Sequence, residues 1–323
     1  MEDLRPHRRG GEPFIIETKF YGNSAYQLAS AETAWAYLKD NVTDEKWNAF
    51  KEITYTTIIK IDPLFNQPFE DHFKLSITSE KPYNSNALKT GMIRTLIFKG
   101  ILYKDEYQGQ VDKIVKDILD NINSVQYWGY IAQFFTDLCE ASPKAVIERL
   151  EGEMKNPTGL KELFESGKNS DMVIGRHYYT HVLFAVEQLL QYKNYAVRAV
   201  KWLLLIDDLD FKYSISNSPK SILEEVFCAW YNVCALTTQQ KIQLAQFAIQ
   251  NYKNSWMLFY NKLPGQSNVI CGSLNKPKYR ESDEIKEVTN KDVVDLYNAY
   301  ADICINNIRG DIDRWTKLIG QLS

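Results

Sequence analysis

"GRHYYTHVLFAVEQLLQY" (175–192) begins the stretch that decides the fold, and three more helical segments follow it in close succession. These are "YAVRAVKWLLLIDDLD" (195–210), "PKSILEEVFCAWYNV" (219–233) and "TQQKIQLAQFAIQNY" (238–252). The stretch ends in an irregular loop, "LPGQSNVICGSLNKPKYRE" (263–281). Amphipathic helices with short polar connections pack as antiparallel neighbours in a row, and such rows build surfaces that hold partners.

Helical patterns of the same kind continue on both sides of this stretch. They cover residues 30–40, 43–60, 86–103, 110–122, 127–141, 143–154, 289–308 and 311–322. Ser142-Pro143 and Ser218-Pro219 are helix-start signals, because serine caps free amides and proline suits the first turn. We expect about a dozen helices, recurring in pairs at roughly 35–45 residues, and no strand pair. The predicted fold class is all-α, an α-solenoid of degenerate two-helix repeats of the tetratricopeptide or HEAT kind.

The predicted organisation has two parts. Residues 1–29 are expected to be irregular, with weak strand character in "PFIIETKFY", and residues 30–323 to form the helical-repeat domain, with a subdivision near 155–172 left open. Residues 62–85 hold three prolines and predict a loop with one short element. No polar capping helix stands near residue 323, so we expect a fragment of a longer protein.

Composition excludes several classes of protein. The chain has 323 residues, of which 45% are hydrophobic and 24% charged, as in globular proteins. Its net charge of −3 disfavours a general nucleic-acid binder, which needs a basic face. Five widely spaced cysteines without a CxxC pair indicate a reduced, cytoplasmic compartment. No signal peptide and no apolar run of membrane-spanning length are visible, so no membrane partner is expected.

Candidate catalytic and metal-binding groups are weak. His177 and His181 have the spacing of metal ligands on one helix face, but no glutamate or nearby ligand cluster completes a site. The acidic run Asp207, Asp208 and Asp210 follows apolar residues like a Walker B sequence, yet a phosphate-binding GxxxxGK[ST] loop is absent. The run more simply ends a helix.

The thiols offer no clearer chemistry. Cys139, Cys228 and Cys234 lack a cysteine–histidine pairing in the sequence and are expected to pack in the core. We therefore predict no catalytic residue, no bound metal, no cofactor and no enzymatic activity. An enzyme whose residues converge around His177, His181 and the acidic run stays open as an alternative.

The loop at residues 274–281 holds the candidate binding residues. Lys276, Lys278 and Arg280 alternate with Pro277 and Tyr279, and long loops in compact helical arrays are often functional. We expect Lys276, Lys278, Tyr279 and Arg280 to contact a partner, either an acidic protein surface or a nucleic-acid backbone. The alternative is that Lys278 and Arg280 cap the ends of neighbouring helices.

Several phrases, taken in order, resemble a block in large bacterial antiphage proteins of the STAND NTPase type, the Avs class. The matching residues are Gly175-Arg176, Leu183–Glu187, Arg198-Ala199, Asn217-Ser218-Pro219, Ser221, Leu223, Glu225, Phe227, Trp230, Trp256, Leu258, Leu263-Pro264-Gly265 and Lys276–Arg280. Tyr279 stands where the family has tryptophan. The resemblance covers most of residues 24–320.

That resemblance implies a sensor of phage proteins. In the family, the helical-repeat region lies C-terminal to an ATPase and recognises phage proteins such as the terminase large subunit or the portal. Recognition there triggers ATP-dependent oligomerisation. This chain has neither ATPase nor effector, so oligomerisation would depend on a missing NTPase portion. The alternatives are a small-molecule or nucleotide-binding regulatory domain, or a general protein–protein scaffold.

Overall fold

The computed structural model describes residues 15–20, 23–28, 31–38, 41–78, 82–168, 177–213, 215–265, 274–308 and 310–322. Contacts within the chain divide it into two units, Met1–Thr56 and Thr57–Ser323. The sequence boundary after residue 29 and the subdivision near 155–172 stay predictions. None of the described helices combines the length and the apolar character that a membrane span requires.

The first unit contains a β-hairpin and helices. Strands β1 (Ile15–Phe20) and β2 (Asn23–Leu28) pair antiparallel. The expectation of an irregular segment without a strand pair is therefore wrong for these residues, where tertiary pairing completes the weak strand pattern. Helices α1 (Ala31–Leu38) and α2 (Asp44–Ile58) follow. In α2, buried Trp47 stacks on Phe50, with ring centroids 5.6 Å apart.

The second unit is helical, as expected. It begins with short 3₁₀ turns, η3 (Pro63–Asn66) and η4 (Phe69–Asp71), and continues through α3 (His72–Thr78). The remaining helices are α4 (Asn86–Leu102), α5 (Lys104–Asp120), α6 (Val125–Ala132), α7 (Phe135–Ala141), α8 (Pro143–Lys155), α9 (Leu160–Ser166), α10 (Tyr178–Leu189), α11 (Lys193–Asp208), α12 (Pro219–Val226), α13 (Thr238–Asn251), α14 (Ser255–Tyr260), α15 (Asn290–Asn306) and α16 (Ile312–Leu322).

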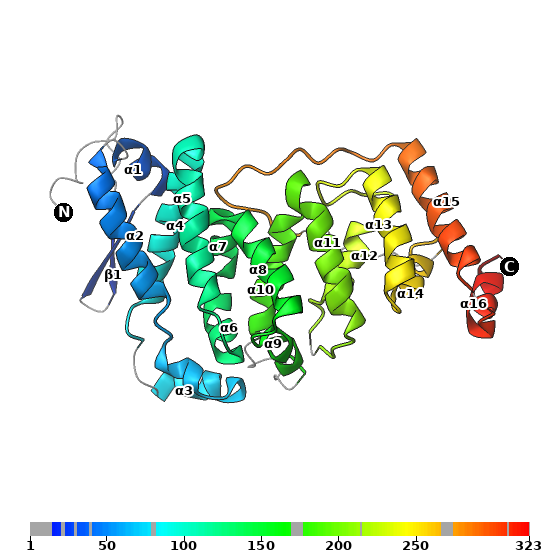
Figure 1. Cartoon of the computed structure of the whole chain (residues 1–323), viewed down its shortest axis with the longest axis horizontal. Coiled ribbons are helices and arrows are strands. Elements are labelled where there is room, and N and C mark those ends of the chain that lie inside the picture. Colours follow the sequence, from blue (N-terminus) through cyan, green and yellow to red (C-terminus); the bar gives the residue numbers. More distant parts are fainter. Residues whose placement is uncertain are drawn as a thin grey trace. The chain divides into compact units, whose positions relative to one another are not determined.

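Most of these helices lie in two rows (Figure 1). In one row α4 contacts α7, and α7 contacts α10. In the other, α5, α8, α11, α13 and α15 each contact the next. Across the rows, α4 packs on α5, α7 on α8, and α10 on α11. This arrangement confirms the helical fold class and is compatible with an α-solenoid.

Helix starts follow their capping signals. Ser142 and Ser218 accept hydrogen bonds from backbone amides in the first turns of α8 and α12. Thr237 and Thr289 form capping boxes at α13 and α15, so each end satisfies free backbone groups locally. These starts could be predicted because a capping side chain and its amide lie only a few residues apart.

Two predicted helices are wrong in extent. The segment 127–141 was expected to be one helix, but it divides into α6 and α7 around Gln133 and Phe134. The segment 219–233 was also expected to be one helix, but α12 ends at Val226. Neither break carries proline or glycine, so tertiary packing overrides local propensity at both places.

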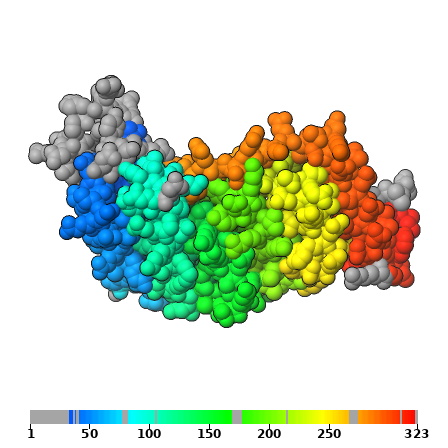
Figure 2. All heavy atoms as spheres, turned by 45° about the horizontal axis from the view of Figure 1, so that its top comes forward, coloured from blue at the N-terminus to red at the C-terminus, as the bar shows by residue number. Residues whose placement is uncertain are grey.

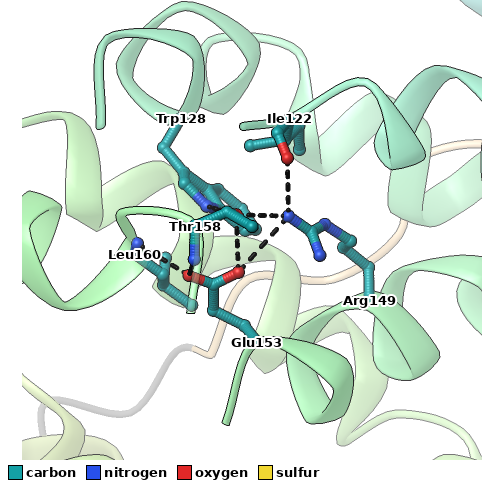
Figure 3. A network of polar contacts seen from close by, with 6 residues as sticks. All are labelled: Ile122, Trp128, Arg149, Glu153, Thr158 and Leu160. Atoms are coloured by element: carbon teal, nitrogen blue, oxygen red, sulfur yellow. Dashed lines mark hydrogen bonds and ion pairs between the residues drawn. The ribbon is translucent and has the colours of Figure 1, made fainter. Parts of the chain in front are cut away.

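A polar network fixes the connection between α8 and α9 (Figure 3). Its members are Ile122, Trp128, Arg149, Glu153, Thr158 and Leu160. Fully buried Glu153 accepts the backbone amides of Thr158 and Leu160 at 2.5 and 3.0 Å. Arg149 donates to the Ile122 carbonyl at 3.1 Å and lies 3.3 Å from Glu153. The buried charge is thus paired and hydrogen-bonded, as burial requires.

Gly159 completes this connection. Its φ of +117° lies in the left-handed region, which favours glycine. A Cβ at this position would lie 2.3 Å from the backbone nitrogen of Val125, at the start of α6. The close approach of the two backbones therefore requires glycine here.

Candidate functional site

Residues 274–289 form an extended segment, called the strap below, that connects the region after α14 to α15. Figure 1 shows the strap in orange, running past the ends of several helices before it enters α15. In Figure 2 it forms a ridge on the surface beside the green and yellow helices. The strap therefore joins parts of the second unit that are far apart in sequence.

Arg280 attaches the strap to the end of α7. Its Nε donates to the carbonyl oxygen of Glu140 at 2.7 Å, and its Nη2 donates to that of Ala141 at 3.0 Å. Nη2 also donates to Gln108 Oε1, on α5, at 2.8 Å. The guanidinium thus satisfies helix C-terminal carbonyls, whose partial negative charge favours a cation.

The buried side chain of Glu140 makes the reciprocal contact. Its Oε1 accepts the backbone amide of Arg280 at 2.6 Å and also the backbone amide of Tyr279. Glu140 is only 2% exposed, so its carboxylate depends on these strap amides for hydrogen bonds. The Tyr279 ring packs edge-on against Phe98 of α4, with centroids 4.9 Å apart.

Further contacts hold the strap along its length. They are Asn275 N to Glu187 Oε2 at 2.7 Å, Asp283 N to Gln191 O at 3.0 Å, Lys193 N to Asp283 Oδ2 at 2.7 Å, and Asn232 Nδ2 to Lys286 O at 3.2 Å. Beyond the strap, Thr238 of α13 donates to Asp292 of α15 at 2.6 Å. The strap is therefore anchored from α5 to the turn after α12, and α15 continues the attachment to α13.

The four loop residues predicted from sequence divide into two pairs. Tyr279 and Arg280 point into the body of the unit, and Arg280 caps α7, as the capping alternative predicted. Lys276 and Lys278 are exposed, and Lys278 caps no helix among the described residues. Partner contact by Lys276 and Lys278 stays a prediction, whereas Tyr279 and Arg280 act in the structure as a clamp.

An aromatic hollow lies against the strap. Its volume is about 770 Å³, and its lining includes Trp230, Tyr231, Leu274 and Lys276. Trp230 is 49% exposed and Tyr231 45% exposed, with ring centroids 6.4 Å apart. Two adjacent aromatic side chains, both about half exposed, therefore lie together on the surface beside the strap.

The early end of α12 produces this exposure. Because the helix stops at Val226, the chain from 227 to 236 turns irregularly, and Ala235 N donates to the Leu190 carbonyl at 2.8 Å. The helical pattern of residues 219–233 predicts a helix through Trp230 and Tyr231, so it does not predict their joint exposure. The sequence did carry a signal for the exposed pair. Two adjacent positions of a helix point in different directions, so one helix face could not bury both aromatic side chains.

Glu187 lies at the edge of this region and holds the start of the strap. Burial raises the pKa of its carboxyl group to about 7, the amide of Asn275 opposes the rise, and the neighbouring Glu225 carboxylate adds to it. Burial also raises the pKa of Glu225, whose Oε2 has no hydrogen-bond partner. Strap attachment at Asn275 therefore involves a carboxyl group that titrates near neutral pH.

The remaining acidic and histidine candidates have structural surroundings. Asp208 accepts the backbone amide of Lys253 at 2.7 Å, so the acidic run ends α11 and fixes the turn before α14. Burial raises the pKa of Asp207 to about 6 and lowers the pKa of His181. No hydrogen bond or ion pair among the described residues joins His177 or His181 to this run.

The thiols lie in the core. Cys139, Cys228, Cys234 and Cys304 are buried, and Cys271 lies outside the described residues. Burial raises the pKa of the Cys139 and Cys234 thiols, which opposes formation of a reactive thiolate. The sequence phrase Gly175-Arg176 also lies outside the described residues.

Neither a search for metal sites nor a comparison with known proteins identifies a function. Within the described part of the chain, no group of three or more histidine, cysteine, aspartate or glutamate side chains could hold a metal ion. Comparison of the chain with protein-family models, curated proteins and solved structures gave no match.

Proposed function

We propose that this chain is a protein-recognition module, with the aromatic hollow beside the strap as its main contact surface. The observation that carries the proposal is the exposed Trp230–Tyr231 pair, held at a fixed place by the irregular turn after α12. Tryptophan and tyrosine are enriched among the residues that dominate binding energy at protein interfaces. The exposed Lys276 lines the same hollow and supplies a charged rim.

The partner follows from the sequence resemblance. In this proposal the chain is the sensor portion of a bacterial antiviral defence protein and binds a phage structural or packaging protein in the cytoplasm. It carries out no catalysis itself, and oligomerisation would involve an NTPase portion of a longer parent. The helical fold and the aromatic surface support this proposal, since stacked helices offer broad surfaces to protein ligands.

Binding of the purified chain to phage terminase large subunit and to phage portal protein tests the proposal. We expect one of them to bind in calorimetry, and Trp230→Ala to weaken that affinity by roughly thirtyfold, as for an interface hot spot. Trp315→Ala is a matched control, because Trp315 is 48% exposed but lies on α16. Equal weakening by both variants would contradict the assignment of the surface, and no binding to either protein would contradict the assignment of the partner.

A small-molecule regulatory module is the second candidate. The aromatic hollow, at about 770 Å³, has the volume of a small-molecule site. Thermal-shift screening of the folded chain against nucleotides separates this candidate from protein recognition. A ligand that stabilises the wild type but not Trp230→Ala would favour it.

A further inference from the structure

A second hollow, of about 750 Å³, lies between the strap, the start of α13 and the face of α15. It meets the aromatic hollow at Asn232, Lys286, Glu287 and Val288, which line both. Its apolar wall includes Leu236, Ile242, Leu296 and Ala299. The hollow is large enough for a small molecule or for a side chain of a peptide.

Lys241 is the one strongly buried charged residue in the lining of this hollow. Its side chain belongs to the first turns of α13, and the residue is only 2% exposed. Nζ makes one long hydrogen bond, 3.5 Å to the Cys228 carbonyl, and no carboxylate lies within ion-pair distance among the described residues. Burial lowers the pKa of Lys241 because the ammonium has lost water without gaining a counter-ion.

Lys89 shows how the same chain treats a buried lysine in a structural role. Lys89 is fully buried, and its Nζ donates to both carboxylate oxygens of Asp62, at 2.8 and 2.7 Å. It also lies 4.9 Å from the ring centroid of Tyr130. An ammonium group can donate three hydrogen bonds. Lys89 donates to a carboxylate and lies over an aromatic ring, whereas Lys241 makes a single long hydrogen bond.

The rim of the hollow carries charges of both signs. Exposed lysines on it are Lys193, Lys286 and Lys291, and exposed acids are Glu284, Glu287, Asp295 and Asp302. The carboxylate of Asp292 already accepts hydrogen bonds from Thr238 and Thr289, which hold its pKa at about 2. The acids outnumber the lysines on the rim, so the rim suits a ligand with a cationic group. Among the lining residues, Lys241 is the buried cation that could meet an anionic group of a ligand.

We propose that this hollow is a binding site for a zwitterionic ligand, whose carboxylate pairs with Lys241 while its cationic group faces the rim acids. The aliphatic part of the ligand packs on Leu296 and Ala299. Two sources supply this chemistry, a free amino acid and a peptide segment that carries one acidic and one basic side chain. The proposal does not rest on protein recognition at Trp230 and Tyr231, which do not line this hollow.

Calorimetry of the full chain with ε-aminocaproate tests the free ligand, with caproate and hexylamine as probes lacking one charge. An end-blocked peptide with one lysine and one glutamate tests the second source. We expect ε-aminocaproate or the peptide to bind, and to bind more tightly than the singly charged probes. Binding of ε-aminocaproate alone assigns a free ligand, and binding of the peptide alone assigns a partner segment. No binding of either, or equal binding of hexylamine, overturns the proposal.

Lys241→Met separates a ligand contact from a structural role. Removing one partner of a buried charge pair weakens binding by roughly thirtyfold or more, whereas Lys291→Met on the rim costs about fivefold or less. The folded state of Lys241→Met should keep its stability, because apolar replacement of a buried charge is often neutral. Ala299→Leu narrows the hollow at its apolar wall, where the ligand would pack, and should also weaken binding. Undiminished binding by either Lys241→Met or Ala299→Leu overturns the proposal.

Discussion

Glu140 and Glu187 hold the strap in the same way, through buried carboxylates. Each belongs to a helix of the same row, α7 or α10, and each accepts a backbone amide from the strap. A buried carboxylate without such donors would be costly, so the strap and these residues depend on one another. They differ in surroundings, because Glu187 has Glu225 as a neighbour and Glu140 has the Arg280 guanidinium attached to its own carbonyl.

The raised pKa of Glu187 predicts a pH-dependent stability. Its folded pKa, about 7, lies above the ordinary value of 4.5, so the folded state binds more protons between these pH values. The contribution of Glu187 is therefore most favourable below pH 4.5 and is lost as pH rises through about 7. Glu187→Gln mimics the protonated form and keeps an acceptor for Asn275.

Urea denaturation of both proteins at several pH values checks this prediction. Relative to wild type, Glu187→Gln should gain roughly 2 kcal/mol of unfolding free energy between pH 5 and pH 8. A difference between the two proteins that stays constant over this range would contradict it. Asp207 also has a raised pKa, but it is present in both proteins and cancels in the comparison.

At the level of elements, short connections in this chain are fixed by single residues. Gly159 permits the turn between α8 and α9, and Glu153 holds the amides that the turn leaves free. Both α6 and α9 approach this turn closely, so a distortion of the turn would displace both helices.

Gly159→Ala should destabilise the fold. The alanine Cβ meets the Val125 backbone, and a left-handed φ strains any residue with a side chain, so we expect a loss of about 1–3 kcal/mol in unfolding free energy. Gly152→Ala is the matched control, because a Cβ on this α8 glycine meets nothing within 4 Å. The control should be neutral or stabilising by about 0.5–1 kcal/mol in chemical denaturation.

The sequence predicted those elements whose signals are local. Ser142, Ser218, Thr237 and Thr289 each mark a helix start through a bond to an amide three residues away. The division between α6 and α7 and the early end of α12 carry no such signal, because they depend on packing between helices. Arg280 was predicted as a contact or a cap, yet its partners could not be named, since Gln108 lies 172 residues away.

For the second unit as a whole, the strap changes how the helices depend on one another. In a simple helical array each hairpin contacts only its neighbours, so disturbances stay local. Here one segment contacts α4, α5, α7 and α10 and then enters α15. A substitution at one strap residue should therefore lower the stability of several helices.

Arg280→Ala tests this dependence. It removes three hydrogen bonds of a charged group, so we expect a loss of about 2–3 kcal/mol in unfolding free energy. Hydrogen exchange should rise in the strap and at the adjoining ends of α5 and α7, but not in α16. Lys278→Ala removes an exposed side chain and should leave both measurements unchanged. Faster exchange confined to the strap itself would contradict the dependence.

The strap also sets an order of events during synthesis. A nascent chain leaves the ribosome from its N-terminus, so α4 through α14 emerge before residues 274–289. Until those residues appear, the carboxylate of Glu140 lacks its strap amides, and the last turn of α7 lacks its guanidinium cap. Contacts between residues so distant in sequence form slowly, because a long loop must close first. Docking of the strap is therefore a late step of folding, and translation must pass residue 280 before α7 has its final surroundings.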